Sequence, residues 1–109
     1  MNDQSQQTTK TIDPVKLDRL AEVAVKVGLG LQKGQDLLLT APAAALPLVR
    51  LIAKHAYKAG AGIVTPILSD EEITLNRFRN GAEESFDRAP SWLYEGMAEA
   101  FSANTARLA

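Results

Sequence analysis

The first candidate for chemistry is a group of three glycines, Gly28, Gly30 and Gly34, next to the apolar run "DLLLTA". A dinucleotide-binding loop needs the spacing G-x-G-x-x-G between a strand and the following helix, because the helix N-terminus must face the pyrophosphate. Here the spacing is G-x-G-x-x-x-G, and the apolar patterns place the glycines after a helix and before a strand. The sequence therefore predicts a helix C-cap and a turn here, and no nucleotide loop.

The second candidate is His55, the only histidine of the chain. Helical spacing places His55 with Lys54 and Lys58 on the polar side of a predicted helix. A catalytic base needs an oriented partner, and no H-E-x-x-H or paired-histidine spacing accompanies this residue. We therefore predict a solvated surface histidine.

Two carboxylate pairs and two aromatic residues are further candidates. Glu71-Glu72 and Glu83-Glu84 are neighbours in sequence, and neighbours on a helix point apart, so neither pair suits a shared acid–base or two-metal site. Capping explains the first pair, and a solvated loop or helix start explains the second. Trp92 and Tyr94 could be contact aromatics, but we expect them to pack in a core or between domains.

The loop Thr40 to Pro47, "TAPAAALP", stands where open α/β sheets bind ligands, between a strand and a helix. Thr40 is its only polar side chain, which favours a stiff connection over a ligand site. No nucleophile–base pair, metal set or phosphate cradle emerges from the sequence. We therefore expect no catalytic, cofactor-binding or metal-ligating residue within these 109 residues.

The first half of the chain predicts two helices and two strands. Asp13 is an N-cap and Pro14 a first helical residue, and that helix should end near Gly28 or Gly30. Its apolar face comprises Leu17, Leu20, Ala21, Ala24 and Val25. A strand over Asp36–Ala41 is expected next, then a helix from about Leu46 with Pro47 in its first turn. The apolar face of this helix comprises Val49, Ile52, Ala53, Ala56, Tyr57 and Gly60.

The second half predicts one more strand and two helices. Ile63–Leu68 is an apolar run in which Pro66 favours an edge strand or a strand end. Ser69 and Glu72 form a capping box that should begin a helix running to about Arg79. The last helix should present one apolar face, comprising Leu93, Tyr94, Met97, Ala98 and Phe101.

This order predicts an α/β fold, a three-layer domain that contains a right-handed βαβ unit with parallel strands. Two strands are too few for a stable parallel sheet, so further strands must come from elsewhere. We therefore interpret the chain as the N-terminal piece of a longer protein, with a flexible polar tail at residues 1–11 and an incomplete domain at residues 12–109.

Composition excludes several classes of protein. The formal net charge is −1, whereas a nucleic-acid-binding domain would carry a basic stripe. No apolar run approaches the roughly 20 residues that span a bilayer. The chain has no cysteine, which fits a reducing cytosol. We expect a cytoplasmic protein with no nucleic-acid partner and no membrane association.

Four stretches in fixed order carry a resemblance to a known family: "VGLGLQKGQDLLLTAP", "ALPLVRLIAKHAYKAGA", "SDEE" and "PSWLYEGMAEAF". From about Lys16 to Ala109 the sequence resembles the N-terminal region of the thermophilic aminopeptidase T and aminopeptidase S type metallopeptidases. The resemblance implies a cytosolic, generally dimeric exopeptidase that removes N-terminal amino acids from peptides. It also implies two divalent metal ions, such as zinc, cobalt or magnesium, that polarise the scissile carbonyl and supply a hydroxide.

The resemblance places the metal-binding Glu, His and Asp residues in a later catalytic domain, so none maps onto a residue of this chain. We predict that the isolated chain neither binds the metal pair nor cleaves peptides. Two alternatives stay open at this point. One is a stand-alone binding module that uses the loop from Thr40 to Pro47, and the other is a dimerisation piece whose apolar helix faces bind a partner.

Overall fold

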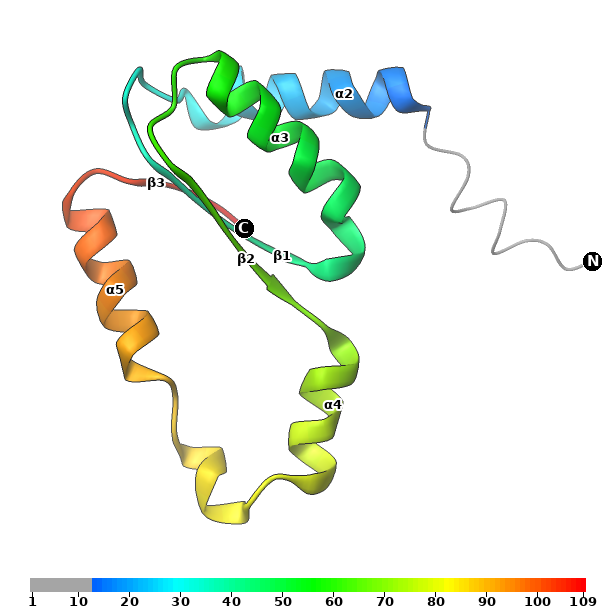
Figure 1. Cartoon of the computed structure of the whole chain (residues 1–109), viewed down its shortest axis with the longest axis vertical. Helices are drawn as coiled ribbons and strands as arrows, with labels where there is room; N and C mark the ends of the chain where they lie inside the picture. The colour runs from blue at the N-terminus through cyan, green and yellow to red at the C-terminus, as the bar shows by residue number, and fades with distance from the viewer. Residues whose placement is uncertain (1–12) are drawn as a thin grey trace, which may run out of the picture.

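The structure is a computed structural model that describes residues 13–109 (Figure 1), so the predicted tail at residues 1–11 lies outside the described residues. It alternates helices and strands, which confirms the α/β class. The helical elements are α2 (Pro14–Val23), η1 (Ala24–Leu29), η2 (Ala43–Ala45), α3 (Leu46–Lys58), α4 (Glu71–Asn80), η3 (Glu83–Asp87) and α5 (Ser91–Ser102). The strands are β1 (Leu37–Pro42), β2 (Val64–Ser69) and β3 (Ala106–Leu108).

The three strands form one parallel sheet in the order β2-β1-β3. The two predicted strands are β1 and β2, joined by α3 as a βαβ unit. Pro66 pairs with Leu39 and lies on the outer strand of this sheet, as the edge prediction required. The sequence patterns did not predict β3, which pairs with the other side of β1.

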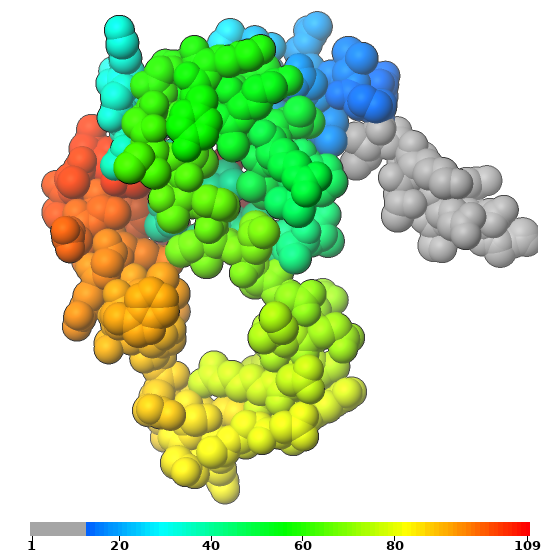
Figure 2. Space-filling model, in the orientation of Figure 1, coloured from blue at the N-terminus to red at the C-terminus, as the bar shows by residue number. Residues whose placement is uncertain are grey.

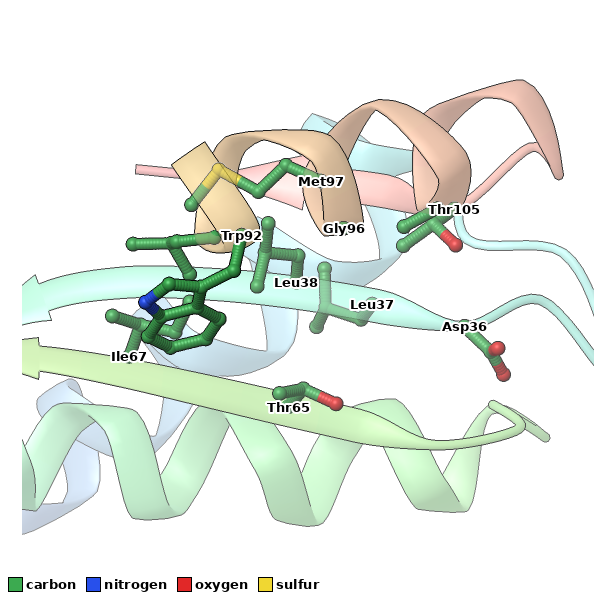
Figure 3. Close-up of a pocket in the computed structure, with 11 residues that line it drawn as sticks. Asp36, Leu37, Leu38, Thr65, Ile67, Trp92, Gly96, Met97 and Thr105 are labelled. Carbon is green, nitrogen blue, oxygen red and sulfur yellow. The ribbon is translucent and has the colours of Figure 1, made fainter. Parts of the chain in front are cut away.

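Helices cover both faces of the sheet, which confirms the three-layer architecture. Leu37 and Leu39 lie on one face and are buried with Val25, Val49 and Ile52 from the helices η1 and α3. Leu38 faces the opposite side, where α5 lies over the strands (Figure 3). The main core therefore lies between the sheet and the first two helices, while α5 forms the third layer.

Local sequence chemistry sets the ends of several helices. The carboxylate of Asp13 accepts a hydrogen bond from the backbone N–H of Val15 at 2.9 Å, which confirms the predicted N-cap. Gly30 ends η1 with a φ of 58°, a left-handed conformation that glycine adopts without strain. Pro47 lies in the first turn of α3, also as predicted.

The capping box predicted at Ser69 is wrong by one residue. Ser69 is the last residue of β2, and Asp70 caps α4 by accepting from the backbone N–H of Ile73 at 3.2 Å. Strand pairing with Pro42 holds Ser69 in extended geometry, so the next polar residue takes the cap. Glu71 and Glu72 still lie in the first turn of α4, where they complement the helix dipole.

The segment from residue 70 to residue 102, here called the arm, leads away from the sheet through α4 and η3 and returns over it through α5 (Figure 1). It comprises α4, η3 and α5, and the space-filling view shows an opening between its two limbs (Figure 2). The radius of gyration is 17.0 Å, whereas a compact domain of about 100 residues has about 13 Å. The arm therefore gives this chain an open outline. Within residues 13–109, no helix is both long enough and apolar enough to cross a membrane.

Candidate functional site

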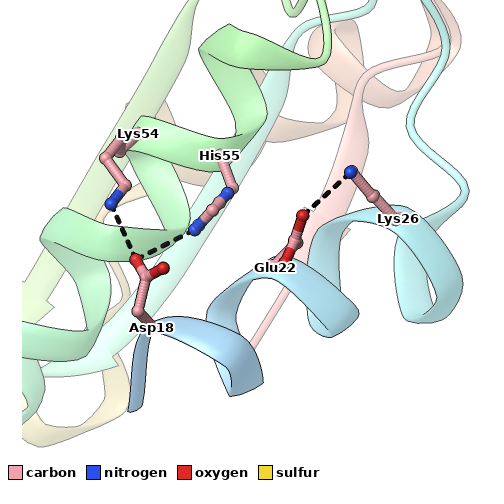
Figure 4. Close-up of polar contacts among 5 residues, drawn as sticks. All are labelled: Asp18, Glu22, Lys26, Lys54 and His55. Carbon is pink, nitrogen blue, oxygen red and sulfur yellow. Dashed lines mark hydrogen bonds and ion pairs between the residues drawn. The ribbon is translucent and has the colours of Figure 1, made fainter. Parts of the chain in front are cut away.

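A polar cluster joins the first two long helices (Figure 4). The carboxylate oxygen Oδ1 of Asp18 on α2 lies 2.7 Å from Nζ of Lys54 and 3.0 Å from Nε2 of His55, both on α3. Only 7% of His55 is exposed. The prediction of a solvated surface histidine is therefore wrong, because α2 packs over the flank of α3 that carries this imidazole.

Two carboxyl groups on α2 have perturbed acidities. Hydrogen bonds from Lys54 and then His55 lower the pKa of Asp18 below its ordinary value of 3.8. The ammonium group of Lys26, 2.9 Å from Glu22 across one helical turn, lowers the pKa of Glu22 in the same way. Both carboxylates are therefore ionised at neutral pH, and Asp18 serves as an acceptor that links α2 to α3.

The donor set of this cluster does not fit a metal pair. The cluster has one carboxylate, from Asp18, and one imidazole, from His55. The ammonium group of Lys54 contacts the same carboxylate oxygen that the imidazole contacts. Among residues 13–109, no group of three or more His, Cys, Asp or Glu side chains lies close enough together to hold a metal ion. Residues 13–109 therefore do not by themselves provide the donors that a catalytic metal pair needs.

An apolar hollow lies between α5 and the sheet (Figure 3). Its volume is about 260 Å³, and its lining includes Leu38 of β1, Ile67 of β2, and Trp92 and Met97 of α5. The indole of Trp92 lies over the strands at the open side of this hollow, with 75% of the residue exposed. Tyr94 is 55% exposed, so neither aromatic residue packs in a core within this chain.

A second hollow lies further along the same sheet face. Its volume is about 380 Å³, and Pro42 and Ser69, the last residues of β1 and β2, line it with Leu75 and Phe78 of α4. Ser69 follows Ile67 by two residues, so both side chains lie on the face that α5 partly covers. We call these two hollows together the sheet-face trough.

The loop from Thr40 to Pro47 has apolar surroundings. It contains the end of β1, the short helix η2 and the first turn of α3. It borders an apolar groove whose lining includes Ala41, Ala45, Leu48 and Leu108, and Thr40 is the only residue of that lining with a side-chain polar atom. The loop thus offers little to orient a polar ligand.

The remaining candidates occupy structural positions. Gly30 caps η1 and Gly34 has a φ of 80° in the turn before β1, which confirms the prediction of a cap and a turn. Glu83 and Glu84 lie in the first turn of η3. Asp18 was not among the predicted site residues, because its only signal in the sequence is an acidic residue within a predicted helix.

Comparisons with known proteins agree with the resemblance. A sequence model of the thermophilic metalloproteases (M29) matches residues 14–109. Aminopeptidase T of Thermus thermophilus is 50% identical over 93 residues, which cover 85% of this chain and 23% of that protein. Aminopeptidase 2 of Geobacillus stearothermophilus is 45% identical over 84 residues, which cover 77% of this chain and 20% of that protein.

A solved structure shares the fold. Wild-type AmpT from Thermus thermophilus superimposes with a TM-score of 0.82 at 48% sequence identity, covering 85% of this chain and 23% of that chain. The chain thus spans between a fifth and a quarter of the length of these relatives. The match over residues 14–109 shows that this chain belongs to the thermophilic metalloprotease family M29.

Proposed function

We propose that this chain is the N-terminal part of a metal-dependent aminopeptidase that removes N-terminal amino acids from peptides. The observation that carries the proposal is the 50% identity with aminopeptidase T across 85% of the chain. In this proposal, residues 12–109 belong to an N-terminal α/β domain, and further polypeptide forms the catalytic domain. We also propose a cytoplasmic homodimer, on the family resemblance.

The proposed enzyme uses two divalent metal ions (zinc, cobalt or magnesium), held outside the present residues. The donor chemistry of residues 13–109 supports this assignment, since the one imidazole is paired with Asp18 and shares that carboxylate with Lys54. The role of the present chain is then to provide a rigid α/β support beside the catalytic domain.

A chimera tests the proposal. Residues 14–109 replace the matched segment of Thermus thermophilus aminopeptidase T, and release of N-terminal amino acids from short peptides is measured. We expect hydrolysis that a chelator abolishes and that added zinc, cobalt or magnesium restores. The isolated 109-residue chain serves as the control, and turnover there with stoichiometric metal would contradict the proposal.

A further inference from the structure

The helix α4 has no covered face in this chain. All ten of its residues are exposed, including Leu75 at 38% and Phe78 at 67%, which lie on the same side of the helix. By contrast, α3 buries four residues, as a helix of a globular domain normally does. Leu75 and Phe78 of α4 line the second hollow of the sheet-face trough, and Trp92 of α5 lines the first, so both limbs of the arm present apolar side chains to the trough.

The arm is ordered by its own contacts. The guanidinium group of Arg77 donates hydrogen bonds to the backbone carbonyls of Ser85 at 3.0 Å and Arg88 at 3.2 Å. The same guanidinium lies 5.7 Å from the ring centroid of Phe86, whose ring is 6.1 Å from that of Phe78. These contacts hold α4 and the η3 segment in a fixed arrangement, which reduces the entropic cost of binding.

The charge of the arm argues against self-association, in which the arm of a second copy would cover this apolar surface. Between Asp70 and Ser102 the sequence has eight carboxylates and three arginines, a formal charge of −5. A symmetric dimer places the same patch of each copy face to face, so two such arms would repel each other. A surface that complements the arm is apolar at its centre and has basic residues at its rim.

The lengths of the relatives indicate which polypeptide carries this complementary surface. The fold is shared at a TM-score of 0.82 with a chain of which this segment covers 23%, and the family match includes the whole arm. The arm therefore occurs in proteins that have more than three times as much additional polypeptide. We propose that the arm and the sheet-face trough dock the remaining polypeptide of the peptidase, through an apolar surface with a basic rim; this rests on the proposed function.

Single cysteines in this cysteine-free chain provide a direct test. Phe78→Cys reports on the arm, and Val27→Cys on η1 is the matched control, since the two native residues are 67% and 76% exposed. Each variant is labelled with a maleimide in the isolated chain and in the chimera, and the labelled peptide is identified by mass spectrometry. We expect similar rates in the isolated chain. In the chimera, labelling at Phe78→Cys should be slower by about tenfold or more, with no change at Val27→Cys.

The outcomes separate the docking proposal from the proposed function. An active chimera with freely labelled Phe78→Cys overturns the docking surface alone, while protection in a chimera without peptidase activity supports the docking surface and contradicts the function. In the isolated chain, protection of Phe78→Cys that rises with protein concentration would assign the surface to a second copy and overturn the proposal. A chimera that stays unfolded while its Thermus parent folds also counts against the proposal, since the arm would then not accept that polypeptide.

Discussion

The imidazole of His55 and the carboxylate of Asp18 meet at 3.0 Å across the contact between α3 and α2. The two residues are 37 positions apart in sequence, so this hydrogen bond is a tertiary link. His55 is buried, while Asp18 is partly exposed and also accepts from Lys54. The pair thus fixes how α2 lies on α3, and α2 contributes Ala21 to the core.

Replacing His55 should destabilise the fold. His55→Ala removes a buried ring and its hydrogen bond to Asp18, so we expect a loss of about 1–3 kcal/mol in the free energy of unfolding. Urea unfolding followed by circular dichroism measures this change. Lys58→Ala, at an exposed position of the same helix, is the control and should cost about 0.5 kcal/mol or less. Equal effects of the two variants would show that the pair does not hold α2 in place.

Low pH should weaken the contact of Asp18 on α2 with His55 and Lys54 on α3. The pKa of Asp18 lies below 3.8 in the folded chain, so the folded state binds fewer protons at this group than the unfolded state does. Its contribution to stability is therefore complete above the unfolded pKa and lost as the pH falls through the lowered folded pKa. We expect Asp18→Asn to flatten the fall in stability across this acid range. Unfolding free energies measured from neutral pH down to acid test this, with Asp87→Asn on η3 as an exposed control.

Features that depend on local chemistry could be predicted from the sequence. The cap at Asp13, the first-turn position of Pro47 and the helix end at Gly30 each follow from one residue's hydrogen-bonding or φ preference. The apolar run from Leu37 to Leu39 likewise predicted a strand that is buried on both faces.

Features that depend on tertiary contacts could not be predicted from the sequence. Periodicity assigned His55 to the polar side of α3, but it cannot show that α2 covers that flank. The strand β3 has only three residues and is fixed by long-range bonds, such as that from the N–H of Ala106 to the carbonyl of Asp36 at 2.9 Å. In the same way, the pairing of Ser69 with Pro42 decided which residue caps α4.

A single hydroxyl connects α3 to the outer strand. The hydroxyl oxygen of Tyr57 accepts a hydrogen bond from the backbone N–H of Val64 at 3.0 Å. Tyr57→Phe removes this acceptor at the start of β2, so we expect a loss of about 0.5–1.5 kcal/mol in unfolding free energy. Amide hydrogen exchange at Val64 should also become faster. Tyr94→Phe is a matched control, because the exposed fractions of Tyr57 and Tyr94 are 51% and 55%.

The turn before β2 leaves no room for a side chain at Gly62. A Cβ there would clash with the carboxylate of Asp36 and lie 2.9 Å from the carbonyl oxygen of Gly34. The same carboxylate accepts from the N–H of Ile63 at 2.8 Å, so Gly62→Ala would displace a bond that aligns β2 with β1. We expect a loss of about 1–3 kcal/mol, measured by urea unfolding.

Gly28→Ala provides the contrast for this last prediction. An added Cβ at Gly28 meets no atom within 4 Å, and its backbone does not have a positive φ. Alanine also lowers the conformational entropy of the unfolded chain, so this variant should be neutral or gain about 0.4–1 kcal/mol. Opposite signs for the two substitutions would show that contact with Asp36 and Gly34 requires glycine at position 62. A loss of equal size at both positions would instead indicate a general intolerance of added methyl groups.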